Sequence, residues 1–278
     1  MTDPNANGAT ASLPPKGRKL PAFFQFYFLF LPFIYFLFEF TKPGVLFTDY
    51  QIYASVFLAI AYVVAIFGLN MGLARICFAA GAFLIAPPLL TKLYVVLVGA
   101  ESLNADIVYY GTHYVAIAAV LYYLFKSGLG FGKLYFSYRP APLLWLITSG
   151  LIAATLIALK LYFNFIPRAP GISIGVGPSL SIPTVALFAI ANGAMEELWF
   201  RSILLGTLVQ SFPSGFAVVY QALLFGLIHW DGIPSGGVGI ALAFIFGAAL
   251  GWLTVRSRSI MPALCIHIAA DFAIGLYL

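Results

Sequence analysis

The feature that most constrains this chain is a group of charges inside a long apolar run. Two adjacent carboxylates and a guanidinium, from Glu196, Glu197 and Arg201, interrupt an otherwise apolar stretch of about residues 182–209. That stretch is long enough to span a bilayer. One lone charge at the centre of a membrane helix costs about 3 kcal/mol even on the mildest scale. Three such groups in one span therefore need partners, a water-filled cavity, or both.

The spacing of these charges predicts how they are used. Glu197 and Arg201 are four residues apart, so on a helix they can pair directly. Glu196 points about 100° away from Glu197, which leaves it outside that pair. A buried ion pair that only fixes helix packing is one interpretation. Ionisable groups inside a membrane are functional sites by default, and we therefore predict a functional site here.

Composition places the chain in a membrane. Of its 278 residues, 62% are hydrophobic and 8% are charged, whereas soluble domains carry about 25% charged residues. The formal net charge is +5, but Lys and Arg lie mostly between apolar runs, where they orient the protein and do not indicate nucleic acid. Cys77 and Cys265 lie in apolar segments without a CxxC neighbour, and we predict that both are packing residues.

The apolar runs predict an all-α, polytopic transmembrane helix bundle. At roughly 20 residues for each span, we expect about nine helices. The runs cover about residues 21–40, 50–69, 73–98, 107–125, 143–166, 182–209, 216–230, 238–255 and 260–278. Pro87 and Pro88 interrupt the third run and are expected to kink or split it.

We divide the chain into three parts. Residues 1–20 are read as a disordered tail, residues 21–140 as an accessory four-helix transmembrane region, and residues 141–278 as the bundle with the polar site. With alternating helices, most loop Lys and Arg fall on the side of the N-terminus. The positive-inside rule then predicts a cytoplasmic N-terminus, in a multi-pass protein of the plasma (inner) membrane.

Further polar residues occur in the late runs. His229 ends the seventh run, with Phe225 one turn before it, and His267 and Asp271 share one face of the last helix. If these helices pack around the Glu196 helix, the charged and polar groups of all three meet. Asn192, one turn before Glu196, could face the same cavity but is not among our predicted site residues.

His113, in the fourth run, has no acidic or histidine neighbour at helical spacing. We predict an interhelical hydrogen bond for it.

The order of these motifs resembles a known family. E-E-x-x-x-R, F-x-x-x-H and H-x-x-x-N or D on successive helices is similar to the CAAX protease and bacteriocin-processing (CPBP, or Abi) family of intramembrane proteases. The Ras-converting CAAX endopeptidase is a relative. The resemblance covers about residues 182–277, and the first four runs resemble no family that we can name. Asp271 stands where many members have Asn, which leaves the oxyanion role of that position open.

The resemblance implies a metal-independent glutamate protease without a cofactor. Glu196 would be the general base that activates water, and His229 would bind or polarise that water. Glu197 and Arg201 would hold the geometry of the base. The chemistry agrees, because a carboxylate removed from water becomes a better base near neutrality.

The same resemblance assigns the remaining positions. His267 and Asp271 would stabilise the oxyanion, since hydrogen-bond donors in a dry site do so more strongly than in water. Phe225 would contact the substrate. That substrate is a peptide or protein, membrane-embedded or lipidated; a prenylated CAAX peptide, a leader peptide and a membrane protein all stay open.

Three alternatives remain at this point. The first is a non-proteolytic relative that acts in bacteriocin self-immunity or as a membrane adaptor. The second is a divalent-metal site, since Glu, His and Asp can be ligands. Against it, the spacing fits no standard zinc motif, Arg201 opposes a cation, and no second carboxylate obviously buttresses either histidine. The third is a proton-coupled transporter, for which no inverted repeat is visible.

Overall fold

The fold is described from a computed structural model. It describes residues 29–30, 32–33, 56, 60, 63, 71–98, 105–137, 147–148, 150–152, 154–155, 181–232 and 236–275. The described part of the chain is helical and contains no strand, which confirms the all-α class. The count of about nine helices is not confirmed. The predicted tail at residues 1–20 and most of the runs at 21–40, 50–69 and 143–166 lie outside the described residues.

The helices follow the later apolar runs closely. Their bounds are α3 Met71–Val98, α4 Ala105–Lys126, η2 Phe131–Leu134, α6 Ile182–Glu197, η3 Leu198–Leu204, α7 Leu205–Leu208, α8 Ser214–Leu227, α9 Gly236–Ser257 and α10 Met261–Gly275. Three of these helices contain segments long and apolar enough to cross a membrane: Gly72–Val98, Ile107–Lys126 and Gly236–Ser257. α8 and α10 are shorter apolar helices.

Helix α3 corrects one expectation. Pro87 and Pro88 both lie inside it, and the helix continues through them to Val98. A proline removes a backbone donor, but neighbouring helices and local adjustments tolerate this in membrane helices. The prolines therefore do not split this run, and the alternative that we expected, a kink, stays a prediction.

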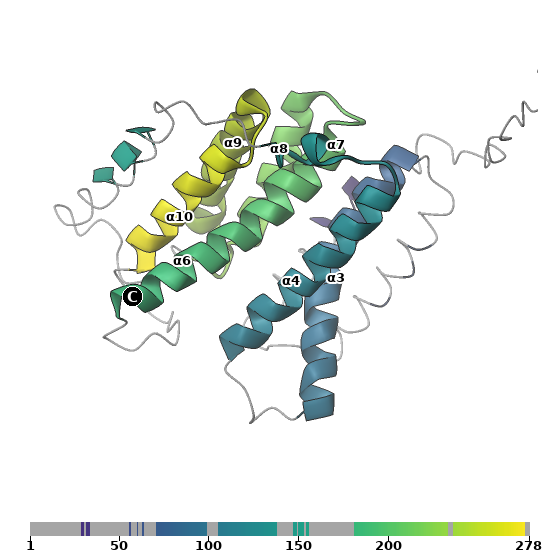
Figure 1. The fold of residues 1–278 in the computed structure, drawn as a ribbon, viewed down its shortest axis with the longest axis horizontal. Helices are drawn as coiled ribbons and strands as arrows, with labels where there is room; N and C mark the ends of the chain where they lie inside the picture. The colour runs from purple at the N-terminus through teal and green to yellow at the C-terminus, as the bar shows by residue number, and fades with distance from the viewer. Residues whose placement is uncertain are drawn as a thin grey trace, which may run out of the picture.

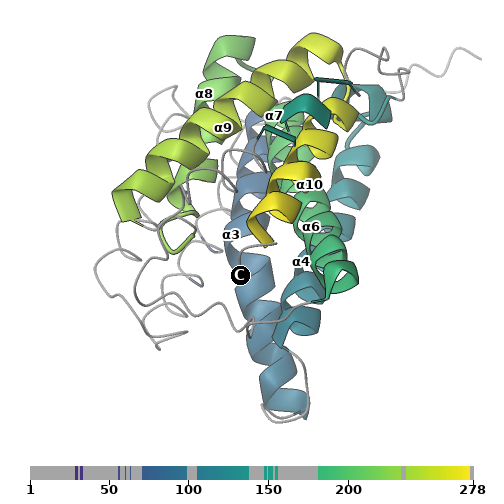
Figure 2. The ribbon, with the colours of Figure 1, turned by 90° about the vertical axis from the view of Figure 1, so that its left-hand side faces the viewer.

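One helical rod runs through the middle of the molecule. It consists of α6, the π-helical segment η3 and α7, which follow one another without a break. α10 packs on one side of α6 and α4 on another, while α8 and α9 pair with each other (Figures 1 and 2). The rod corresponds to the charged run of the sequence, so the charged residues lie at the centre of the bundle.

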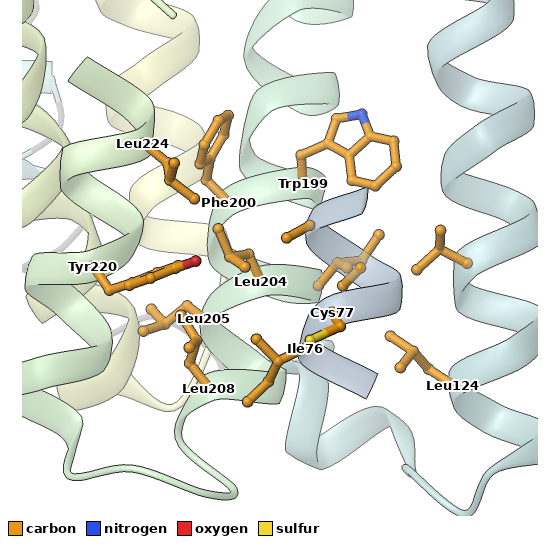
Figure 3. Packing of buried hydrophobic residues seen from close by; sticks show 14 of the residues in the cluster. Ile76, Cys77, Leu124, Trp199, Phe200, Leu204, Leu205, Leu208, Tyr220 and Leu224 are labelled. Carbon is orange, nitrogen blue, oxygen red and sulfur yellow. The ribbon is translucent and has the colours of Figure 1, made fainter. Parts of the chain in front are cut away.

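The apolar core surrounds η3 and α7. Figure 3 shows the side chains of this part of the rod between those of α8 and those of α3 and α4. Trp199 and Phe200 are buried, and each packs edge-on against Phe83 of α3, with ring centroids 5.3 and 5.0 Å away. The early helices thereby contact the segment that carries Arg201.

Close approach of α6 and α10 depends on a glycine. A Cβ atom at Gly193 would lie 3.1 Å from Ile268 Cγ1 and 3.2 Å from its backbone nitrogen. Small residues at such crossings allow backbones to pack tightly. Since Glu196 follows Gly193 by three residues and His267 precedes Ile268, this contact brings the two polar helices together.

The loop between α4 and residue 137 ties two ends of the bundle together. Ser202 Oγ donates a hydrogen bond to the carbonyl oxygen of Leu134 at 2.6 Å. The backbone N–H of Ile260, at the start of α10, donates to the carbonyl of Tyr135 at 3.0 Å. This loop therefore anchors both η3 and α10, the elements that carry Arg201 and His267.

The outward faces of the helices are apolar. Along α9, the exposed side chains include Val238, Leu242, Ile245 and Trp252, each more than half exposed. A soluble protein rarely exposes so continuous an apolar face, whereas a lipid bilayer favours it.

Candidate active site

The structure brings all six predicted polar residues together. Glu196 and Glu197 end α6, Arg201 lies in η3, and His229 lies in the turn after α8. His267 and Asp271 lie in α10. Residues far apart in the sequence thus form one cluster through the packing of α6 against α10.

Arg201 and Glu197 form the predicted ion pair. Arg201 Nη1 lies 2.9 Å from Glu197 Oε1, and neither side chain is exposed. The guanidinium carbon lies 4.4 Å from the centre of the Phe225 ring, which adds a cation–π contact. Both residues are therefore inaccessible to a substrate, and their effect on chemistry has to pass through a neighbour.

His267 is that neighbour. Its Nδ1 lies 2.7 Å from Glu197 Oε1, inside the buried interior. Because the same carboxylate oxygen is also paired with Arg201, it acts as the acceptor here, so the imidazole carries a proton on Nδ1. His267 Nε2 then faces Asp271 Oδ1 at 3.6 Å and Glu196 Oε2 at 3.4 Å.

Glu196 has one occupied and one open oxygen. Its Oε1 accepts a hydrogen bond from Asn192 Nδ2 at 3.2 Å. Its Oε2 has no hydrogen-bond partner among the described residues. This oxygen lies 3.4 Å from His267 Nε2 and 4.0 Å from His229 Nε2. The second separation exceeds a direct hydrogen bond and lies within reach of one bridging water.

His229 forms the accessible side of the cluster. Its side chain is 27% exposed, against 3% for His267. Its Nδ1 donates to the carbonyl oxygen of Phe225 at 2.7 Å, which leaves Nε2 as the nitrogen that faces Glu196. The imidazole packs on the Phe225 ring with centroids 4.5 Å apart. Backbone and ring together hold His229 in one orientation.

Phe225 lies beneath the site. It is 1% exposed and packs edge-on against His267, with ring centroids 5.8 Å apart. Its contacts with both histidines and with Arg201 give it a supporting position. No observation tests the predicted contact between Phe225 and a substrate, so it stays a prediction.

Asn192 belongs to the cluster, although it is not among our predicted site residues. Besides its bond to Glu196, its Nδ2 lies 3.1 Å from Asp271 Oδ2. The available signal was its four-residue spacing from Glu196, which places both on one helix face. Contact with Asp271 across two helices had no signal in the sequence.

His113 also differs from the prediction. Its Nδ1 donates to the carbonyl of Tyr109 in its own helix at 2.8 Å, and not to another helix. The rings of Tyr109 and His113 are 4.4 Å apart, the same arrangement as Phe225 and His229. In the same helix, Tyr114 Oη donates to the carbonyl of Ala191 at 2.9 Å. α4 therefore packs against α6, the helix that carries Glu196.

The case against a metal changes in one respect. Among the described residues, no group of three or more His, Cys, Asp or Glu is arranged to hold a metal ion. However, Glu197 accepts a hydrogen bond from His267 Nδ1, and a carboxylate behind a histidine is common around zinc. The expectation that no carboxylate supports either histidine is therefore wrong. The main argument against zinc is now the positive charge of Arg201 beside Glu197.

The arrangement is suited to proton transfer. It presents one open carboxylate oxygen between two imidazole nitrogens, in a site that is otherwise buried. Such a site can remove a proton from water and stabilise a developing negative charge with nearby donors.

Comparison with known proteins locates the same region. The family model described as type II CAAX prenyl endopeptidase Rce1-like matches residues 178–273. The matched segment begins just before α6 and ends in α10, so it contains all six clustered residues. Comparisons with curated proteins and with solved structures give no match.

Proposed function

We propose that this chain, which belongs to the CAAX protease family through its Rce1-like segment at residues 178–273, hydrolyses a peptide bond with a water activated by Glu196. At the level of the family, the match supports a CAAX-type intramembrane endopeptidase, a hydrolase with a peptide or protein substrate. Together with the apolar helices, it indicates an integral membrane protein. The glutamate mechanism is our proposal.

One observation carries this mechanism. Glu196 Oε2 is buried, has no hydrogen-bond partner among the described residues, and faces Nε2 of both His229 and His267. A general base needs a free oxygen within reach of the water that it activates, and a second group to hold that water. His229, on the accessible side, is placed for the second task.

The reaction follows from these positions. As the water oxygen attacks the carbonyl carbon of the peptide bond, Glu196 takes one of its protons, and the carbonyl oxygen becomes an oxyanion. The Glu196 carboxyl then gives that proton to the leaving amine, and the C–N bond breaks. One carboxylic acid and one amine are formed, and the carboxylate is regenerated.

His267 is the proposed donor to the oxyanion. Because its Nδ1–H is donated to Glu197, its Nε2 can donate only when the ring carries both protons. Asp271, close to the same nitrogen, orients it and can itself donate only when protonated. Glu197 and Arg201 act through His267, which differs from a direct hold on Glu196.

We further propose that the site works without a metal or cofactor, that the N-terminus is cytoplasmic, and that the protein lies in the plasma (inner) membrane. The substrate would be a prenylated CAAX peptide or a leader peptide. The spacing of basic loops supports the orientation, and the Arg201 cation beside Glu197 opposes a bound dication.

The test is a comparison of protein termini in membranes. Cells producing the wild-type chain and cells producing Glu196→Ala at equal level are compared by mass spectrometry of membrane peptides. We expect a set of new N- or C-termini that is present only with the wild type. If both cells show the same termini, a non-proteolytic adaptor role replaces this proposal.

A further inference from the structure

A side-chain amide lies between two acidic groups at the centre of the site. Asn192 Nδ2 is 3.2 Å from Glu196 Oε1 in its own helix and 3.1 Å from Asp271 Oδ2 in α10. Both carboxyl groups are about nine-tenths buried. No other described contact joins these oxygens, so the amide links α6 to α10 at the level of the base.

The identity of the amide atom follows from its partners. An oxygen in this position could contact both acids only if both were protonated, whereas an NH₂ group has one hydrogen for each carboxylate. Asn192 therefore donates to both. It supplies a donor to each acid without adding charge to the cluster.

The opposite side of the two acids faces a single imidazole nitrogen. His267 Nε2 is 3.4 Å from Glu196 Oε2 and 3.6 Å from Asp271 Oδ1. Asn192, Glu196, His267 and Asp271 thus form a closed ring of polar groups. In this ring each acid has one oxygen on the amide and one toward the imidazole.

Such a ring has a clear use for the reaction. Two acids that share one amide nitrogen and one imidazole nitrogen oppose each other's ionisation, and a hydrogen bond to the charged form counteracts that effect. Because the amide holds Oε1, the free electron pairs of Glu196 are directed through Oε2 toward the two histidines.

We infer that Asn192 is a positioning residue for the reaction: it keeps Glu196 ionised and aimed, and it couples the base to Asp271. This inference rests on the proposed function for its catalytic consequence, but the coupling between the two acids can be measured without any substrate.

Other charged and titratable groups face this ring and shape its pH dependence. They come from the rod, from the turn after α8 and from α4: Glu197, Arg201, His229, Tyr109 and His113. The variants below leave all of them in place, so a change in pH profile reports on Asn192 and its two partners.

The experiment uses the full chain in proteoliposomes, with Asn192→Leu, Asn192→Asp, Asp271→Asn and the double variant Asn192→Asp/Asp271→Asn. Gln210→Glu is the matched control, because Gln210 donates to the carbonyl of Gly206 and contacts neither acid. Elution profile and thermal unfolding establish that each variant folds.

We expect Asn192→Leu to lower kcat about 10- to 100-fold with little change in KM, the effect of losing a charge-assisted hydrogen bond. The acidic limb of its pH profile should move to higher pH, because the lost donor had favoured the ionised acid. Asn192→Asp should lower kcat by a factor that is at least about threefold smaller in the Asp271→Asn background than in the wild type, because contacting residues are coupled. Gln210→Glu should match the wild type.

Infrared titration of the carboxyl band provides the readout that needs no substrate. Glu196→Gln and Asp271→Asn assign the bands, and in Asn192→Leu both acids should stay protonated to higher pH than in the wild type. An unchanged titration in a folded Asn192→Leu, or strictly additive single variants, would overturn the inference. If the wild type cleaves nothing, the proposed function fails, and the infrared result still decides the role of Asn192.

Discussion

Arg201 and Glu196 carry charge in the same cluster but in different ways. Arg201 is fully buried behind Glu197, whereas Glu196 presents an open oxygen to the histidines. Arg201→Lys should therefore keep part of the activity, because an ammonium can partly replace the guanidinium. Glu196→Gln should lose about 10²- to 10⁴-fold, the usual contribution of a general base.

Cleavage rates of the two variants at equal protein level are the measurement. Equal losses would mean that Arg201 also contacts water or substrate, which its burial argues against.

Removing the Arg201 cation altogether should lower the free energy of unfolding. Arg201→Met leaves Glu197 buried without its cation, and breaking a buried ion pair in this way costs about 3–5 kcal/mol. Thermal unfolding in detergent should show a marked loss for Arg201→Met and a partial recovery when Glu197→Gln is added. If the double variant is less stable than Arg201→Met alone, the uncompensated charge of Glu197 is not the cause.

At the scale of the elements, the site depends on how closely α6 and α10 pack. A Cβ at Gly193 would lie 3.1 Å from Ile268 Cγ1, so Gly193→Ala must push the helices apart by a few tenths of an ångström. The same substitution at Gly111, in α4, meets nothing within 4 Å. We expect Gly193→Ala to lower the cleavage rate and Gly111→Ala to leave it unchanged.

The measurement is the cleavage rate of Gly193→Ala and of Gly111→Ala, each normalised to the amount of folded protein. Full activity of Gly193→Ala would show that the two helices can separate without disturbing Glu196 and His267.

The sequence predicted which polar residues pair within one helix better than it predicted the contacts between helices. Four-residue spacing within one helix predicted the Glu197–Arg201 pair, because that geometry is local. The high cost of buried charge predicted that separate helices meet. The π-helical geometry of η3 and the bond from His267 to Glu197 depend on packing between helices, which no residue spacing encodes.

The whole molecule joins the early helices to the site. Phe83 of α3 packs on Trp199 and Phe200, and Tyr114 of α4 donates to the carbonyl of Ala191. Residues 141–278 produced alone should therefore be unstable, since this apolar surface and this carbonyl would lose their partners. Co-production of residues 1–140 should restore accumulation and cleavage.

Immunoblotting of membranes measures how much of the fragment accumulates, and the cleavage assay measures its activity, with and without residues 1–140. A fragment of residues 141–278 that accumulates and cleaves alone would show that the early helices are accessory in folding as well as in sequence.

The central claim is that Glu196, and not a bound metal, activates the water. The most direct measurement is the cleavage rate of a peptide identified by the terminus comparison, with purified protein in vesicles after extended treatment with a strong chelator. We predict that the chelated wild type keeps its full rate with well under about one zinc per chain, and that Glu196→Gln in the same vesicles is slower by about 10²- to 10⁴-fold. Activity that is lost on chelation and regained on adding zinc would contradict the account and make Glu196 a metal ligand.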